Sequence, residues 1–255
     1  MAHISFSEIK IWNECSFKHK LMYKDKLKGF VGNLYTAFGS AMHSVCEKKL
    51  LKEDVDDDFF IHEFEKNLES LDDDVNINQK LIYDMMGQGK KIIPEIKDAL
   101  DNYFEKDYEV LFVEMPLIVP IEGEEDYNFK GYIDAVVMTP HDKKIHIFDW
   151  KTCSWGWDAR KKNDKMVTYQ LTLYKHFFAQ KLKIDPNEIE THFALLKRTA
   201  KYNRVEFFRV TSGPKKTQNA LKLLNKALYN IKKKRHIKNR LSCHNCNFRH
   251  TKHCP

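Results

Sequence analysis

The stretch FKGYIDAVVMTPHDKKIHIFDWKT, residues 129–152, decides the fold. Its segments 129–138 and 144–150 are rich in β-branched and aromatic residues, and the polar segment between them is typical of a turn. These features predict two successive strands. The strands carry Asp134, Asp149 and Lys151. Because side chains alternate along a strand, Asp149 and Lys151 are expected on the same side.

Similar patterns outside this stretch predict the rest of the fold. Runs rich in β-branched and aromatic residues predict further strands at 108–121, 189–198 and 204–210. Helical spacing of apolar residues predicts helices at about 6–15, 37–51, 77–106 and 166–182, and from about 214. Ser5 and Glu8 form a capping box for the first helix, and Pro94 is expected in the first turn of a second segment within 77–106. The acidic runs 53–58 and 72–74 are expected to be exposed loops.

The composition excludes two classes of protein. A chain of 255 residues with 42% hydrophobic and 31% charged residues is typical of an ordered globular protein, not of a disordered one. No apolar run approaches the roughly 20 residues of a membrane span, and MAHISFSEIK lacks the layout of a signal peptide. We therefore expect no membrane partner and a reducing cytoplasm, or the host-cell cytoplasm if the protein is viral.

Charge is divided unevenly along the chain. The last acidic residue is Glu206, so residues 1–206 carry a formal charge of −6 and residues 207–255 carry +13. Such a tail suits a polyanion, because phosphate neutralisation releases condensed counterions. A solvated helix face would show the same charge pattern. The candidate DNA-contacting residues of this segment are Lys215, Lys216, Lys222, Lys226, Lys232, Lys233, Lys234 and Arg235.

Two carboxylates and a lysine at neighbouring strand ends indicate a particular chemistry. Carboxylate oxygens are the ligands that Mg²⁺ and Mn²⁺ prefer, and a cation held there would activate a phosphodiester. A lysine beside them would orient the attacking water or stabilise the developing negative charge. Glu114, expected to open the strand before Asp134, is a further candidate for the acidic set.

Gly131-x-x-Asp134 followed by Asp149-x-Lys151-Thr152 resembles the signature of the PD-(D/E)xK nuclease superfamily, particularly its RecB-like and Cas4-like branch. The resemblance extends to His43 in the helix before the sheet, and to Tyr169, Gln170 and Tyr174 in the helix after it. It implies that Asp134 and Asp149 bind Mg²⁺ or Mn²⁺ and that His43 assists as a ligand. It also implies that Tyr169, Gln170 and Tyr174 position DNA and the catalytic lysine.

The cysteines of the C-terminal tail indicate a second metal. Cys243, Cys246 and Cys254 are one ligand short of an all-cysteine site. The same branch includes proteins in which one cysteine before the domain and three after it hold a [4Fe–4S] cluster, which implies Cys15 as the fourth ligand. Zn²⁺ bound by Cys243, Cys246, His250 and Cys254 is the alternative. Cys46 and Cys153 are expected to be ordinary packed thiols.

The predicted architecture is an α/β fold with a PD-(D/E)xK core, in which helices flank a central mixed sheet. We expect a single nuclease domain, 1–255, made of a helical part (1–107), a catalytic α/β core (108–210), and a basic helix with the cysteine tail (211–255). The resemblance implies an exonuclease acting on single-stranded DNA or DNA ends, working beside a separate helicase or a recombination or CRISPR partner. Two alternatives lack catalysis: a nucleic-acid-binding protein with a zinc tail, and a structural subunit that keeps the fold.

Overall fold

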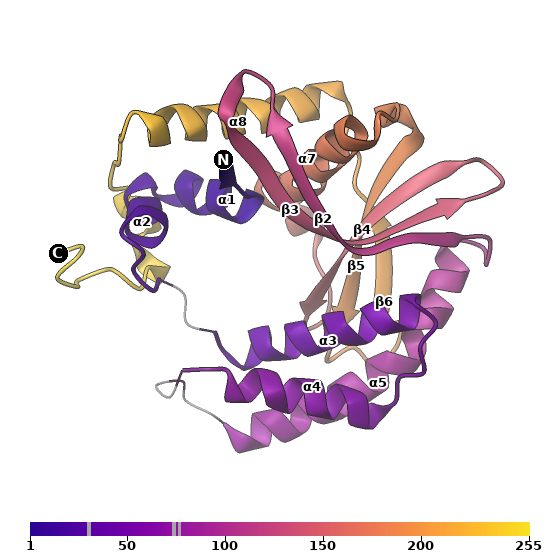
Figure 1. Ribbon diagram of the computed structural model, residues 1–255. Coiled ribbons are helices and arrows are strands. Elements are labelled where there is room, and N and C mark those ends of the chain that lie inside the picture. Colours follow the sequence, from indigo (N-terminus) through magenta and orange to yellow (C-terminus); the bar gives the residue numbers. More distant parts are fainter. Residues whose placement is uncertain (30–31, 73–74, 76–77) are drawn as a thin grey trace. The chain divides into compact units, whose positions relative to one another are not determined.

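The computed structural model describes residues 1–29, 32–72, 75 and 78–255. Asp73 and Asp74 of the second acidic run, and the start of the predicted helix 77–106, lie outside them. The chain divides into two compact units (Figure 1). Unit 1 comprises Met1–Val31, Ile118–Gly131 and Gly213–Pro255, and unit 2 comprises Gly32–Leu117 and Tyr132–Ser212. The single nuclease domain with parts 1–107, 108–210 and 211–255 stays a prediction.

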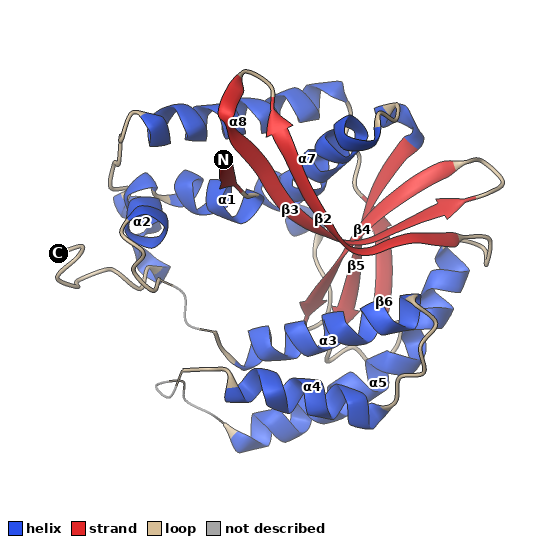
Figure 2. Cartoon of the chain, viewed as in Figure 1, coloured by secondary structure: helices blue, strands red, loops and turns tan. Residues whose placement is uncertain are grey.

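Unit 2 contains a mixed sheet, which confirms the predicted fold class. Its strands are the second half of β3 (Glu124–Thr139), β4 (Lys144–Cys153), β5 (Ile189–Lys197) and β6 (Val205–Arg209). β4 runs antiparallel to β3 and parallel to β5, and β6 runs antiparallel to β5 (Figure 2). β2 (Glu109–Ile121) pairs with β3, and both strands contribute to the two units.

Helices flank this sheet on both faces. α3 (Leu34–Leu50), α4 (Asp57–Glu69) and α5 (Gln79–Tyr103) share one hydrophobic core with Phe148 and Trp150, which alternate along β4. Asp149, which lies between them, therefore faces the other side of the sheet. There α7 (Lys165–Leu182) packs against β4 and β5, after the short α6 (Ala159–Asn163). The 3-10 helix η2 (Pro186–Glu188) leads into β5.

Two helix predictions were wrong in detail. Pro94 lies inside the continuous helix α5 instead of starting a second segment. Proline removes one backbone donor from a helix, but Pro94 is on the exposed face of α5, where its ring disturbs no core packing. Ser5 caps the first helix as predicted, accepting from the Glu8 N–H, but the Glu8 carboxylate bonds to buried His19 at 2.7 Å instead of completing a capping box.

Unit 1 joins the two ends of the chain. β1 (Ala2–Ile4) pairs in parallel with β3, and α1 (Phe6–Glu14), α2 (Ser16–His19) and the π-helix η1 (Lys20–Lys24) follow. α8 (Pro214–Lys232) packs against α1 and leads to the 3-10 helix η3 (Arg240–Asn245). Among the described helices, none has the length and apolar character needed to cross a membrane.

Candidate functional site

The residues predicted to carry the chemistry meet in unit 2. Asp134 lies on β3, and Asp149 and Lys151 lie on β4. The antiparallel register pairs Ala135 with Phe148, so one residue further along each strand Asp134 and Asp149 come opposite each other. An oxygen of Asp134 (Oδ2) accepts from the Trp150 backbone N–H at 2.7 Å, and Lys151 Nζ lies 2.5 Å from Asp149 Oδ2. We call Asp134, Asp149, Lys151, His43 and Gln170 the acidic centre.

His43 reaches this centre from α3 and presents a lone pair to it. Its Nε2–H donates to the Trp150 carbonyl at 3.1 Å, so a neutral ring leaves Nδ1 unprotonated. That nitrogen lies 3.5 Å from Asp134 Oδ2. Burial lowers the pKa of His43, which favours the neutral ring. Two electron-pair donors that face each other at this distance suit a bound cation.

Gln170 holds Asp149 from the opposite helix layer, on α7. Its Nε2 donates to Asp149 Oδ1 at 2.7 Å and to Tyr174 Oη at 3.3 Å, so Gln170 contacts the acidic centre directly and Tyr174 contacts it through Gln170. Burial, with Asp149 nearby, raises the pKa of Tyr174. Tyr174 therefore stays a hydroxyl. Tyr169 is buried on the same helix, but the described residues give it no hydrogen bond to the centre.

The electrostatics of the centre show excess negative charge. Burial and the charge of Asp149 raise the pKa of Asp134 well above its usual range. Burial alone would lower the pKa of Lys151, but Asp149 and Asp134 outweigh it and raise that pKa. Lys151 is thus firmly cationic, and one lysine does not relieve the repulsion between two buried carboxylates. A divalent cation bound between the two carboxylates would relieve this repulsion.

Glu114 does not open a strand, contrary to the prediction. It lies within β2, and its φ of +48° places a non-glycine residue in the left-handed region. Such a backbone is strained for a residue that carries a Cβ atom. The charge of Glu114 nevertheless acts on the centre, because it contributes to raising the pKa values of Asp134 and Glu47.

A groove that the sequence analysis did not predict begins four residues after Lys151. It has a volume of about 780 Å³ and is lined by Trp155, Gly156, Trp157, Asp158, Arg160, Lys161, Lys162, Asp164, Val167 and Glu206. Trp155 is 76% exposed, and Lys161 Nζ lies 4.7 Å from the centre of the Trp157 ring. The tryptophan-rich segment 155–157 between β4 and α6 was the signal available in the sequence.

The four predicted cluster cysteines line one pocket in unit 1. Cys15, Cys243, Cys246 and Cys254 surround a space of about 380 Å³. The tail reaches them by folding back on the first helices. The Asn239 N–H donates to Cys15 Sγ at 3.3 Å, and the Ile237 N–H donates to Ser16 Oγ at 2.8 Å. We call this space the cysteine pocket.

Three potential metal ligands lie close together in unit 2. Three zinc ligands would lie within about 4 Å of one another. Among the described residues, the set that comes within 4.8 Å is His146, Glu190 and His192, not the tail set with His250 and not the acidic centre. Cys46 is fully buried in the core and Cys153 is half-buried, as expected of packed thiols.

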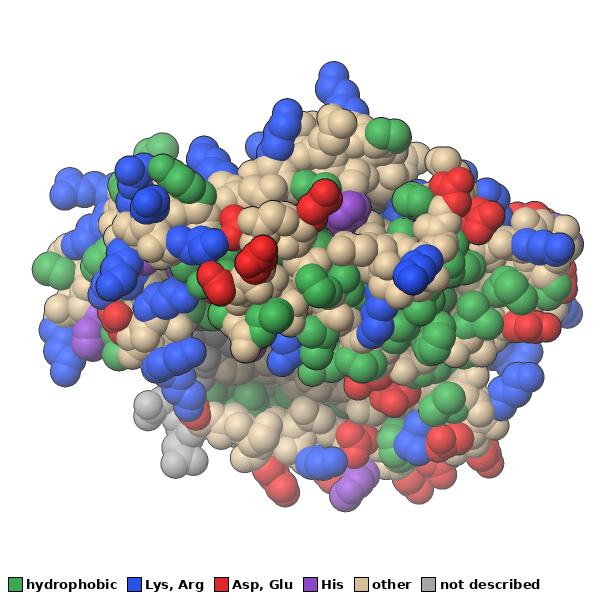
Figure 3. All heavy atoms as spheres, turned by 45° about the horizontal axis from the view of Figure 1, so that its top comes forward, with side chains coloured by type: hydrophobic (Ala, Val, Ile, Leu, Met, Phe, Trp, Pro, Cys, Tyr) green, Lys and Arg blue, Asp and Glu red, His purple; other side chains and the backbone are tan. Residues whose placement is uncertain are grey.

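The candidate DNA-contacting lysines lie in unit 1. Lys and Arg side chains gather on the left of the view in Figure 3, the side where Figure 1 labels α2 and the C-terminus. Lys215, Lys222 and Lys226 share the exposed face of α8, opposite the buried Leu224 and Leu228. Lys232 forms an ion pair with Glu124, and Lys216 is half-buried.

Comparison with known proteins identifies the family. Residues 3–254 match the model of the PD-(D/E)XK nuclease superfamily, and the chain belongs to that superfamily. A crystal structure named "Putative exonuclease", from Eubacterium rectale, has the same fold, with a TM-score of 0.63 and 14% sequence identity. The alignment covers 95% of this chain and 86% of that one. No curated protein matches the sequence.

Proposed function

We propose that the protein is a Mg²⁺- or Mn²⁺-dependent DNA exonuclease whose active site is the acidic centre. The observation that carries the proposal is the pair of facing electron donors, His43 Nδ1 and Asp134 Oδ2, beside Asp149 and Lys151. The superfamily supplies the reaction class, hydrolysis of a phosphodiester. The structural neighbour's name supports an exonuclease.

The chain's own groups have separate tasks. Asp134 and Asp149, with His43, would hold the cation, which supplies Lewis-acid activation of the phosphate and of water when bound. Gln170 fixes the orientation of the Asp149 carboxylate. Lys151 stays protonated, so it orients the attacking water or stabilises the charge that develops on the phosphate.

The substrate would be a DNA strand or end. Trp155 offers an exposed ring on which a base stacks, and Arg160, Lys161 and Lys162 offer cations to the backbone of the same strand. The lysines on the exposed face of α8 would add affinity that does not depend on sequence.

The RecB-like and Cas4-like branch, with its [4Fe–4S] cluster, is the finer assignment. The donor set fits a cluster, because four cysteines line one pocket whose wall also includes the apolar side chains of Phe17, Leu21 and Phe248. Its role would be to fasten the tail to the first helices. A separate helicase or a recombination partner would supply unwound strands.

Digestion of end-labelled linear DNA and of circular DNA tests the function. With Mg²⁺ or Mn²⁺, an exonuclease releases label from linear DNA and leaves covalently closed circles intact. EDTA stops the release. A protein that binds both DNAs but cleaves neither, with either metal, would contradict the proposal and favour a non-catalytic binding protein.

A further inference from the structure

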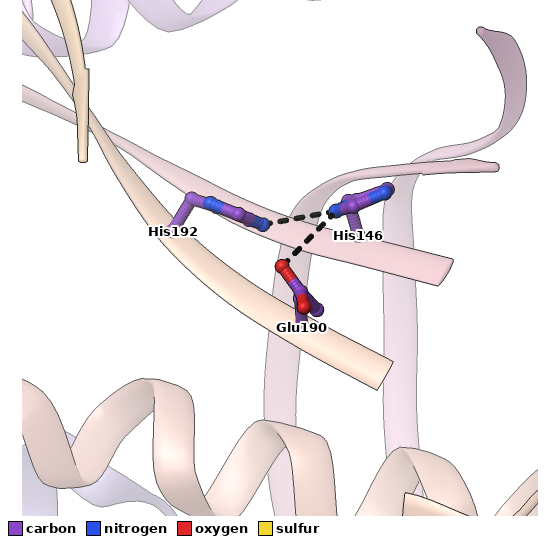
Figure 4. Close-up of side chains that lie close together, drawn as sticks. All are labelled: His146, Glu190 and His192. Carbon is purple, nitrogen blue, oxygen red and sulfur yellow. Dashed lines mark hydrogen bonds and ion pairs between the residues drawn. The ribbon is translucent and has the colours of Figure 1, made fainter. Parts of the chain in front are cut away.

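A second set of potential metal ligands lies in unit 2, on the other face of the sheet from Asp149. His146 lies on β4, and Glu190 and His192 lie on β5, with His146 paired to Glu190 in the ladder (Figure 4). His146 and Asp149 are three positions apart, so their side chains point to opposite faces, about 10 Å apart along the strand. The acidic centre does not use these residues.

The distances suit a small cation. His146 Nδ1 and His192 Nε2 are 3.1 Å apart, the separation of two nitrogens that bind one ion at about 2.0–2.1 Å with an angle near 100°. A carboxylate oxygen of Glu190 (Oε2) lies 4.0 Å from His146 Nδ1, so a shift of less than about 1 Å brings it into the same sphere. Both imidazoles are buried, and Glu190 is partly exposed.

Hydrogen bonds on the far side of each ligand fix its orientation. The Thr139 hydroxyl donates its proton to Asp142 at 2.5 Å, so its oxygen accepts from His146 Nε2–H at 2.9 Å. A neutral His146 therefore directs the lone pair of Nδ1 toward His192 and Glu190. Burial lowers the pKa of His146, consistent with a neutral ring.

The other two ligands are held in the same way. His192 Nδ1 lies 3.0 Å from Tyr103 Oη, and burial lowers the pKa of His192 to about 3. If the proton moves to Nδ1, it is donated to Tyr103 and Nε2 becomes free to bind an ion, with no net change of charge. Glu190 Oε1 is paired with Arg209 at 2.8 Å, which leaves Oε2 for the ion. Partners of this kind are typical of metal-binding histidines and carboxylates.

We propose that His146, His192 and Glu190 form a Zn²⁺ site, distinct from the nuclease metal, that ties β4 to β5. Two imidazoles and one carboxylate are a zinc set that leaves a fourth position for water. The site lies on the face that packs against α5, and Tyr103 at the end of that helix is one of its supporting residues, so a bound ion would also connect this helix to the two strands.

Zinc titration of the full-length protein tests the proposal, by calorimetry in excess Mg²⁺. Glu190→Gln is the decisive variant because Glu190 is partly exposed, and Glu188→Gln is its matched control, exposed and two residues away. We expect Glu190→Gln to lose one zinc equivalent, or to bind it at least about tenfold more weakly, while Glu188→Gln matches the wild type. Zinc bound at other sites is the same in all three proteins, so it does not affect the difference between them.

A second measurement identifies the ligands of the zinc equivalent that Glu190→Gln loses. With Co²⁺ as the probe, that equivalent should give weak visible bands without the intense thiolate charge-transfer absorption that a cysteine site gives. His146→Gln should remove the same bands. Equal zinc uptake by wild type and Glu190→Gln would overturn the proposal. His146, His192 and Glu190 would then form a hydrogen-bonded network that binds no metal. A lost equivalent with thiolate absorption would also overturn it.

Discussion

The acidic centre of unit 2 and the cysteine pocket of unit 1 differ in what holds their reactive atoms. In the centre, side chains hold one another: Asp149 is bound by both Lys151 and Gln170. In the pocket, the sulfurs of Cys15 and Cys243 bond to backbone groups, and the thiols face an open space of about 380 Å³. A preorganised centre suits catalysis, whereas an open ligand set suits a group that stabilises the fold. Substitutions in the acidic centre should therefore lower activity more than stability. Substitutions in the cysteine pocket should lower stability more than activity.

The largest expected effect is on cleavage, from Lys151→Ala, Asp134→Asn or Asp149→Asn. Each should lower the rate by about 10³-fold or more, because each removes a group that acts in the transition state. Initial rates on labelled linear DNA measure this. The double variant Asp134→Asn/Asp149→Asn should be little slower than either single one. Lys91→Ala, at an exposed lysine, is the control. If the rate reduction of the double variant equals the product of the two single reductions, the residues do not act as one cooperative centre.

Cys15→Ser should instead act on stability. Losing a metal bond that fastens the tail should cost several kcal/mol, and each kcal/mol lowers the Tm of a chain this size by about 2–4 °C. Iron and sulfide analysis of anaerobically purified protein, with thermal melts, measures both effects. Cys153→Ser, in unit 2, should keep its iron. Iron content unaffected by Cys15→Ser would exclude that residue as a ligand.

A smaller effect is expected from Gln170→Ala. It leaves Asp149 Oδ1 without its donor, a loss of about 1–2 kcal/mol and hence about tenfold in kcat, with KM little changed. Tyr174→Phe removes the second partner of Gln170, together with the hydroxyl's bond to the Tyr132 backbone, and should cost less because Asp149 keeps its donor. Steady-state kinetics of both variants tests the order, and a Tyr174→Phe defect larger than that of Gln170→Ala would reverse the assigned roles.

Trp155→Ala should weaken binding of single-stranded DNA by about tenfold, because stacking of one base contributes about 1–3 kcal/mol. Fluorescence anisotropy in the inactive Asp149→Asn background separates binding from cleavage. Tyr83→Ala is the matched control, since that ring is 80% exposed on α5. If the two variants bind alike, the groove is not the path of the strand.

The smallest effect should come from the lysine face of α8. Replacing Lys215, Lys222 and Lys226 by Gln should flatten the slope of log affinity against log salt by about 2 for a single strand. Sequence preference should not change. The same substitutions at Lys80, Lys91 and Lys97 of α5 serve as the control. An unchanged slope in the α8 variant would mean that these lysines form only a solvated face.

The sequence predicted the parts of this molecule that depend on local pattern. The β-branched and aromatic residues of 129–152 predicted β3 and β4, and helical spacing of apolar residues predicted the helix that carries Gln170 and Tyr174. Pairing register could not be predicted. For that reason His146 and His192, which are 46 residues apart in the chain, gave no signal as a pair, although Glu190 and His192 are two apart on one strand.

Backbone strain and long-range assembly were also beyond the sequence pattern. Nothing in residues 109–121 marks Glu114 as left-handed, because its neighbours are ordinary strand formers. Pro94 is tolerated within α5 because of the face on which it lies, which depends on tertiary packing. Each of the two units is made of separate segments of the chain, and β2 and β3 contribute to both units. This division likewise depends on contacts between residues that are far apart in the sequence.

The most direct test of the account is release of a terminal label from linear single-stranded DNA by wild type and by Asp149→Asn, with equal iron contents. The account predicts rapid Mg²⁺-dependent release by the wild type, none above background by Asp149→Asn, and equal melting temperatures within about 2 °C, about 1 kcal/mol or less of stability. Equal release by the two proteins would contradict the assignment of the acidic centre as the active site.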